Sequence, residues 1–237
     1  NEKLLYLIDN NCCEAYGITK QDVFQGYTGE SNSRGVLYNE DPVTGDARFC
    51  ATTASMCGIE SAGFEQNEEK KKRAVRFDLM LHAYMMVQSG IPMLYSGDEI
   101  GQVNDYTYKN DPEKRVDSRY IHRGKFDWKL ADGRKRKGTV QKELFDGIGK
   151  LRSIRSKEKV FDASANVWTL DTWENGILGV VRELEGEQMT ALFNFAEEDR
   201  TAWIEEEGEY MDLYTGKKVS LQAIKMEGHS FVLAKKC

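Results

Sequence analysis

The sequence contains no long apolar run. Its 237 residues are 40% hydrophobic and 30% charged, and the apolar stretch around Met85–Val87 is interrupted by Gln88, Ser89 and Gly90. A membrane-spanning helix needs about 18 consecutive apolar residues, so we expect no membrane partner. The composition is typical of a globular protein with one large domain, or with one domain and a smaller second one.

Residues that bind metals are scarce and scattered. There are five cysteines and three histidines; Cys12 and Cys13 are adjacent, and Cys50 and Cys57 do not form a C-x-x-C motif. This pattern predicts no zinc site, and we expect no other metal or cofactor. An odd number of cysteines in a chain of this length favours a reducing compartment, so we expect a cytoplasmic protein.

The chain also lacks an excess of positive charge. Its net charge is −6, which argues against nucleic acid as the partner. The local run Lys70–Arg73 follows two glutamates and indicates a solvated helix end. No secretory signal is visible. Because the chain begins at Asn1 rather than at a methionine, we expect it to be a piece of a longer protein.

Apolar residues at helical spacing predict a helix over residues 69–88 that is buried on most sides. It should end at Ser89-Gly90, and Pro92 prevents its continuation. The continuous apolar run over residues 91–96 predicts a strand buried on both faces, as in a parallel sheet. The helical stripe consists of Phe77, Met80, Leu81, Tyr84 and Val87.

A second amphipathic pattern predicts a helix over residues 138–157. Gly147 and Gly149 weaken it by about 1 kcal/mol each relative to alanine, and we expect them to allow close packing. Shorter helices are predicted over residues 4–18 and 19–27, the latter with Thr19 as N-cap. The helical stripe of 138–157 consists of Val140, Leu144, Ile148, Leu151 and Ile154.

From about Asn166 onward, the sequence consists of short, often alternating apolar segments. Turns such as Glu185-Gly186, Glu207-Gly208 and Thr215-Gly216 separate them. Short strands at this spacing predict an antiparallel β-sandwich. The sequence therefore predicts an α/β part up to about residue 160, followed by an all-β part.

The predicted strand over 91–96 leads directly into a polar loop of about twenty residues, a length that is often functional. Asp98 and Glu99 stand at its start. Polar residues at the carboxyl end of a barrel strand usually face an active site, and glycoside chemistry needs two carboxylates. However, adjacent residues of a strand point to opposite faces, so these two cannot both address one bond, and a structural role is the alternative.

The segment "GIPMLYSGDEIG" resembles the last barrel strand of the α-amylase family, glycoside hydrolase family 13. Its Gly-x-Pro-x-x-Tyr-x-Gly-x-Glu pattern is met by Gly90, Pro92, Tyr95, Gly97 and Glu99. The continuation is similar to amylosucrases and related sucrose-acting enzymes. The motifs that carry this narrower resemblance are Gly97-Asp98-Glu99, Asn104-Asp105-Tyr106, Asp117-Ser118-Arg119 and His122-Arg123.

Upstream, "SRGVLYNEDPVTGDAR" resembles the amylosucrase stretch inserted between barrel strands seven and eight. The resemblance implies the C-terminal part of a (β/α)₈ TIM barrel, with the last helix, the eighth strand, the eighth helix and an inserted loop region, followed by an antiparallel β-sandwich. We therefore expect a barrel insertion over 1–65, the end of the barrel over 66–160 and the β-sandwich domain over 161–237. The inserted stretch is shorter than in typical amylosucrases.

The family's three catalytic carboxylates follow strands four, five and seven, and the chain contains no His-Asp pair of the strand-seven kind. The resemblance therefore implies no catalytic residue in this chain and a structural role for Glu99. It implies a parent enzyme with a retaining mechanism acting on sucrose or α-glucan oligosaccharides, and an inactive chain when alone. An α-amylase or α-glucosidase, a non-catalytic carbohydrate-binding module and a scaffold without chemistry are the alternatives.

The resemblance also implies which residues contact sugar. Arg119 matches an arginine that contacts the bound glucosyl unit, and Arg48 matches a residue on the acceptor side. An ordinary arginine paired with Asp117 is the alternative for Arg119, and a turn arginine is the alternative for Arg48. Weaker candidates for substrate binding are Asp117, His122 and Tyr106. Three tryptophans fall in the sandwich, where we expect core packing rather than stacking on glucan: Trp168, Trp173 and Trp203.

Overall fold

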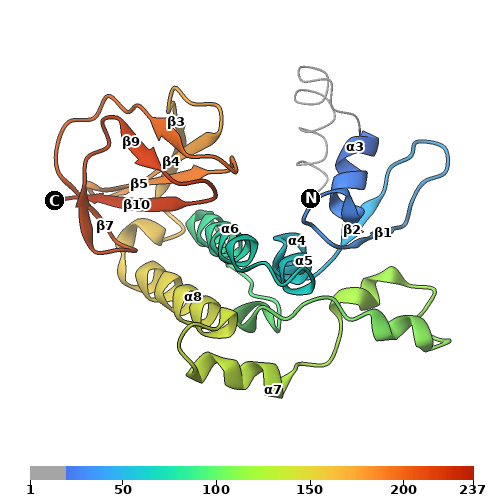
Figure 1. The fold of residues 1–237 in the computed structure, drawn as a ribbon. Coiled ribbons are helices and arrows are strands. Elements are labelled where there is room, and N and C mark those ends of the chain that lie inside the picture. The colour runs from blue at the N-terminus through green and yellow to red at the C-terminus, as the bar shows by residue number, and fades with distance from the viewer. Residues whose placement is uncertain (1–19) are drawn as a thin grey trace. The chain divides into compact units, whose positions relative to one another are not determined.

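A computed structural model describes residues 20–237 (Figure 1). The described chain divides into two compact units, which we call the loop unit (residues 20–74 and 96–131) and the β unit (residues 75–95 and 132–237). The helix predicted over 4–18 and the N-cap Thr19 lie outside the described residues. Within them, none of the helices is long and apolar enough to cross a membrane. The three-part division by residue number stays a prediction.

The loop unit consists of short elements joined by ordered loops. Segment 51–64, for which the sequence predicted no structure, forms two short helices, because the Thr52 side chain accepts the Ser55 N–H as an N-cap and Gly58 separates the helices at φ 94°. The elements are α3 (Lys20–Gln25), η2 (Gly26–Glu30), β1 (Val36–Tyr38), β2 (Arg48–Cys50), α4 (Thr53–Met56), α5 (Ile59–Phe64), the start of α6 (Glu68–Val87), η3 (Asp98–Ile100), η4 (Tyr106–Asn110), η5 (Ser118–His122) and α7 (Trp128–Ala131).

An antiparallel hairpin of β1 and β2 packs against the polar loop of residues 97–123. Cys50, Tyr108 and Ile121 form the buried centre of this contact. The Ser118 hydroxyl donates a hydrogen bond of 2.8 Å to the Leu37 carbonyl, which ties η5 to the hairpin. The long loop is therefore ordered by its own small core.

The β unit contains strands from residue 166 onward. The antiparallel strands predicted from the sequence for this part of the chain are therefore confirmed. The six-stranded antiparallel sheet has the order β3 (Asn166–Leu170), β4 (Ile177–Leu184), β5 (Glu187–Asn194), β10 (Phe231–Lys236), β7 (Tyr210–Asp212) and β8 (Lys217–Val219). A second sheet pairs β6 (Arg200–Ala202) with β9 (Ile224–Met226).

The six-stranded sheet is covered on both faces, as Figure 1 shows within this unit. On one face, Met189 and Phe193 of β5 pack against α6 and α8 (Val140–Lys157). On the other face, Leu192 packs toward the second sheet with Met226. The alternation of β5 side chains thus follows the two-residue period of a strand. Two 3₁₀ turns flank α8: η6 (Asp132–Lys135) and η7 (Lys159–Phe161).

Both long helices predicted from the sequence are confirmed. Thr139 caps α8 by accepting the Lys142 N–H. A Cβ at Gly147 would stand 2.5 Å from Leu79 Cδ2 of α6, so this glycine allows the two helices to approach closely. The same expectation for Gly149 is wrong, since a Cβ there would meet nothing within 4 Å.

The strand predicted over residues 91–96 is not formed. Ile91, Met93 and Tyr95 are exposed, and in the described part of the chain no strand pairs with this segment. A parallel strand needs hydrogen-bonded neighbours, and the sheets described above provide none here. The residues of this segment are apolar, as the sequence shows, but an apolar segment forms a β-strand only when another strand pairs with it.

Two arginines fix the end of α6, immediately before this segment. Arg182, which is fully buried, donates to the carbonyls of Val87 (2.9 Å) and Val160 (2.6 Å). Arg155 donates to the Met86 and Gly90 carbonyls, the latter at 2.7 Å. Carbonyls at a helix C-terminus have no partner within the helix, so these guanidinium groups satisfy them.

The three tryptophans of the β unit are not in its core, so the expectation of core packing is wrong. Trp168, Trp173 and Trp203 are 44%, 70% and 58% exposed. Trp173 and Trp203 lie outside regular strands, and Trp168 lies on the edge strand β3. The physical reason is that residues at a sheet edge and in turns have no layer above them.

Candidate functional site

Asp117 and Arg119 form a paired group at the start of η5. The Asp117 side chain caps η5 by accepting the Arg119 backbone N–H at 3.0 Å. The guanidinium then donates to the same carboxylate through Nε at 2.9 Å and through Nη2 at 2.7 Å. This is the two-pronged arrangement in which arginine binds a carboxylate most strongly. The side chain of Arg119 is therefore held in one orientation.

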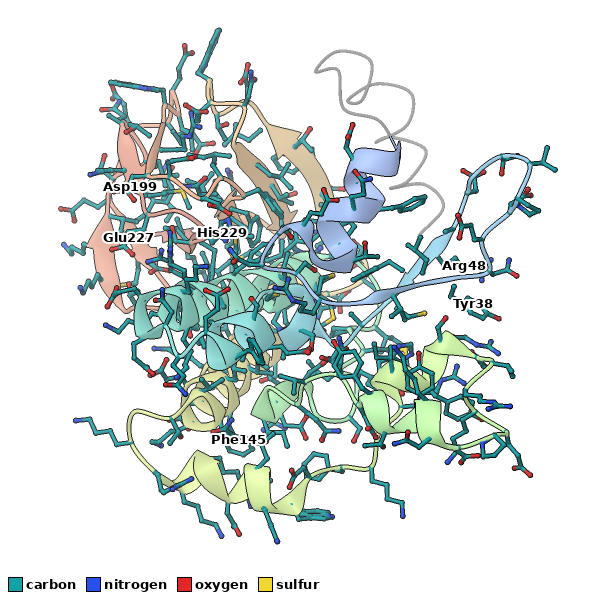
Figure 2. The ribbon with its side chains drawn as sticks, turned by 45° about the vertical axis from the view of Figure 1, so that its right-hand side comes forward. Tyr38, Arg48, Phe145, Asp199, Glu227 and His229 are labelled. Atoms are coloured by element: carbon teal, nitrogen blue, oxygen red, sulfur yellow. The ribbon has the colours of Figure 1, made fainter. Side chains whose placement is uncertain are left out.

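Tyr38 provides a second support for Arg119. The guanidinium carbon of Arg119 lies 4.6 Å from the centroid of the Tyr38 ring, a cation–π arrangement. Tyr38 is also the cross-strand partner of Arg48 in the β1–β2 hairpin, and Figure 2 shows the two labelled residues next to one another. The hairpin thus sets Arg48 opposite the tyrosine that contacts Arg119, a tyrosine that the sequence did not indicate.

The ionisation of the pair follows from these contacts. The Arg119 guanidinium lowers the pKa of Asp117 to about 2, chiefly through the side-chain hydrogen bond. Conversely, the hydrogen bond from Asp117 raises the pKa of Arg119. Asp117 is therefore an anion at neutral pH and cannot act there as a proton donor. It serves to hold the arginine.

His122 lies at the other end of η5 and is half-buried. Burial lowers its pKa, and the charge of Arg123 lowers it further. The neutral imidazole is therefore favoured at pH 7. The thiol of Cys50 lies beneath the same cluster, and burial raises its pKa, so it belongs to the apolar floor of the site.

Tyr106 belongs to a different network. Its hydroxyl donates to Glu60 at 2.8 Å, and Glu60 also accepts the Ser55 hydroxyl at 2.5 Å. Asn104 joins this network through its N–H, which donates to the Ser55 hydroxyl oxygen at 2.9 Å. Burial raises the pKa of Tyr106, so the phenol stays protonated. This network connects helices α4 and α5 to the polar loop.

Glu99 lies in the short 3₁₀ turn η3. Its carboxylate accepts the Gly97 N–H at 3.1 Å, and Gly97 itself has φ 105°. A local hydrogen bond of this kind stabilises the sharp turn at which the apolar segment becomes the polar loop. The catalytic or structural role of Glu99 stays a prediction.

The sequence indicated Arg119, Arg48, Asp117 and His122 but not Tyr38, which contacts Arg119 and pairs with Arg48 in the hairpin. Tyr38 and Arg48 are paired across nine intervening residues, and no turn type fixes such a register. Chemically, these residues provide the guanidinium of Arg119 in a fixed orientation. Among the described residues, no partner accepts a hydrogen bond from Nη1 of Arg119, so its two N–H groups are available to a ligand.

No model of a known protein family matches the chain. Solved structures are similar in fold. A variant of AmyP in complex with maltotriose is 14% identical over 69% of this chain, with a TM-score of 0.55. The trehalulose synthase MutB from Pseudomonas mesoacidophila is 15% identical over 68% of this chain, with a TM-score of 0.51.

The chain matches only 35% of the first of these chains and 38% of the second. At this low identity the similarity establishes the fold alone. The fold class predicted from the sequence is confirmed: the described residues have the fold of the end of a (β/α)₈ barrel followed by an antiparallel β domain.

Proposed function

We propose that this chain is part of an enzyme that acts on α-glucosyl sugars, either sucrose or an α-glucan, and that Arg119 binds a glucosyl unit. The observation that carries the proposal is the orientation of Arg119 between Asp117 and Tyr38, with Nη1 directed to no other described group. A guanidinium held in this way binds a ring hydroxyl without losing side-chain entropy. The fold shared with AmyP and MutB supports the proposal.

The finer assignment is an amylosucrase-like enzyme. It is supported by the motifs between Gly90 and Arg123 and by the position of Arg48 opposite Tyr38, the tyrosine that contacts Arg119. We assign Arg119 to the glucosyl side and Arg48 to the acceptor side of the substrate. The alternative is an α-amylase or α-glucosidase type of hydrolase, in which water takes the glucosyl unit.

The reaction of the parent enzyme would be a retaining one. It needs a carboxylate nucleophile and a carboxylic acid/base about 5 Å apart. Asp117 does not meet the second requirement, because its pKa of about 2 keeps it ionised. The residues of this chain would instead bind and orient the sugar, and the family resemblance places the catalytic carboxylates on other barrel strands.

The test is sugar binding by the whole chain, measured by NMR titration with sucrose and with maltotriose. A charge-assisted hydrogen bond contributes roughly 1.5–3 kcal/mol, so Arg119→Ala should weaken binding by about ten- to a hundredfold. Arg119→Lys should restore little of the sugar affinity. The single nitrogen of lysine cannot make two hydrogen bonds to the Asp117 carboxylate and also leave a second nitrogen for the sugar.

Arg115→Ala is the matched control, since Arg115 is an exposed arginine of the same loop. It should bind both sugars as the unaltered chain does. The proposal is wrong if Arg119→Ala, with its fold confirmed by circular dichroism, binds as tightly as the control, or if the unaltered chain binds neither sugar.

A further inference from the structure

Two exposed tryptophans of the β unit are held next to one another by the backbone. The Trp203 N–H donates a hydrogen bond of 2.9 Å to the Thr172 carbonyl, which places Trp203 beside the turn of residues 171–176 that carries Trp173. Both side chains are more than half exposed. Scattered apolar residues on a surface need no explanation, but two indoles at adjoining backbone positions do.

The turn that carries Trp173 is strained and firmly held. Trp173 has φ 53°, a left-handed conformation that bulky residues rarely adopt. Its N–H donates to the Asp171 carboxylate at 2.9 Å, and the buried Thr172 hydroxyl lies 2.8 Å from the Ile177 carbonyl. Strain of this kind persists where the surroundings enforce it, and it clusters at ligand sites. The fold thus keeps a strained backbone conformation at a residue whose indole is exposed to solvent.

Carboxylate and guanidinium groups lie on the turn that carries Trp173 and on strand β6, which directly precedes Trp203. Asp171 starts the turn, and Glu174 accepts the Gly176 N–H at 3.2 Å while it pairs with Arg200 at 3.6 Å. An indole face attracts the C–H groups of a pyranose ring, because its π cloud is negative and those hydrogens are positive. Carboxylate and guanidinium groups at its side bind neighbouring hydroxyls in pairs.

We propose that Trp173 and Trp203 form a binding site for the pyranose rings of an oligosaccharide. The site uses residues of the β unit alone, so the proposal does not depend on the role of Arg119. Two side chains are far too few for a stable protein interface, which buries about 800 Å² on each partner. The carboxylates of Asp171, Glu174 and Glu198 outnumber the nearby Arg200, which disfavours a phosphate-bearing ligand that would stack in the same way.

The experiment follows the four indole N–H signals of the ¹⁵N-labelled whole chain during a titration with maltoheptaose, and in a second arm with cellohexaose. The signals of Trp173 and Trp203 should shift and saturate, while that of Trp128, which is 74% exposed in the loop unit, should stay in place. The two arms distinguish an α-linked from a β-linked ligand.

The variants are chosen so that folding is preserved. Trp173→Asn removes the ring but keeps a residue that tolerates positive φ. It and Trp203→Ala should each weaken binding about tenfold, the usual consequence of removing an aromatic anchor. Trp128→Asn is the matched control and should change nothing.

The proposal is overturned if neither oligosaccharide shifts the Trp173 and Trp203 signals, or if, in each single variant, the signal of the remaining indole saturates at the same oligosaccharide concentration as in the unaltered chain. A change of oligomeric state in Trp173→Asn, seen by size-exclusion chromatography, would identify a self-association surface instead and would also overturn it. Arg119→Ala should leave these two signals responsive, so a failure of the proposed function is distinguishable from a failure of this site.

Discussion

At the scale of single residues, the candidate site depends on one ion pair. Asp117 caps η5 and also holds Arg119, so a single carboxylate sets both the backbone turn and the orientation of the guanidinium. Of the two interpretations of Arg119 that the sequence left open, the pair with Asp117 is present. It does not exclude a role in sugar binding, because Nη1 takes no part in it.

The pair makes a prediction about pH. The folded pKa of Asp117 is about 2, below the unfolded value of about 3.9, so the pair stabilises the fold fully above about pH 4 and loses this contribution as pH falls toward 2. A ¹³C titration of the Asp117 carboxyl carbon should show a midpoint near 2, rising toward about 3.9 in Arg119→Ala. A midpoint near 4 in the unaltered chain, insensitive to the substitution, would contradict the geometry of the pair.

The residues of the candidate site that the sequence predicted were indicated by family motifs and not by residue spacing or composition. Arg119, Arg48 and His122 were indicated by resemblance, whereas Tyr38 was missed because its role arises only when the hairpin and η5 pack together. For Trp173 the sequence predicted core packing, and this is wrong for a related reason. Its exposure results from a turn conformation with positive φ, and tryptophan gives no signal for such a turn.

At the scale of elements, the glycines of α8 separate two effects that the sequence could not separate. Both lie inside a helix, where glycine costs about 0.5–1 kcal/mol relative to alanine. Only Gly147 faces a neighbour: an added Cβ would meet Leu79 Cδ2 at 2.5 Å and the Tyr214 hydroxyl at 3.0 Å. Gly149 faces open space.

Alanine at the two positions should therefore act in opposite directions. Gly149→Ala should raise the free energy of unfolding by about 0.5–1 kcal/mol through helix propensity. Gly147→Ala should lower it by about 1 kcal/mol, because overpacking against α6 outweighs the same gain. Urea denaturation of the two variants measures both. If both variants change the free energy of unfolding by the same amount, Leu79 and Tyr214 move away from the new methyl group without destabilising the fold.

The helices and strands that the sequence predicted correctly are those whose signals are local. Thr139 caps the start of α8, and short apolar runs on either side of the turn Glu185-Gly186 mark β4 and β5. Segment 91–96 was predicted wrongly because strand formation depends on neighbours, and the described chain offers none. The carbonyls before it are instead satisfied by Arg155 and Arg182, a long-range contact that no local pattern reveals.

At the scale of the whole molecule, the two proposed binding sites lie in different units. The loop unit contains the Tyr38–Arg119 cluster, and the β unit contains the tryptophan pair. The β unit has a sheet covered on both faces and extensive cores, whereas the loop unit has short elements held by hydrogen-bond networks such as the one around Glu60. Both proposed sites bind sugar, so each can be tested without an assay of catalysis.

The last prediction is that the chain by itself binds sugar but does not cleave it. In the loop unit, Asp117 is kept ionised by Arg119, and Glu60 accepts hydrogen bonds from Ser55 and Tyr106, so neither is arranged as a nucleophile beside a proton donor. Incubation of the purified chain with sucrose, maltotriose and a chromogenic α-glucoside should release no product above a buffer control. Glu99→Gln provides the decisive comparison. Turnover that this substitution abolishes would make Glu99 catalytic rather than structural, because the amide preserves the size of the side chain but removes its acid/base capacity.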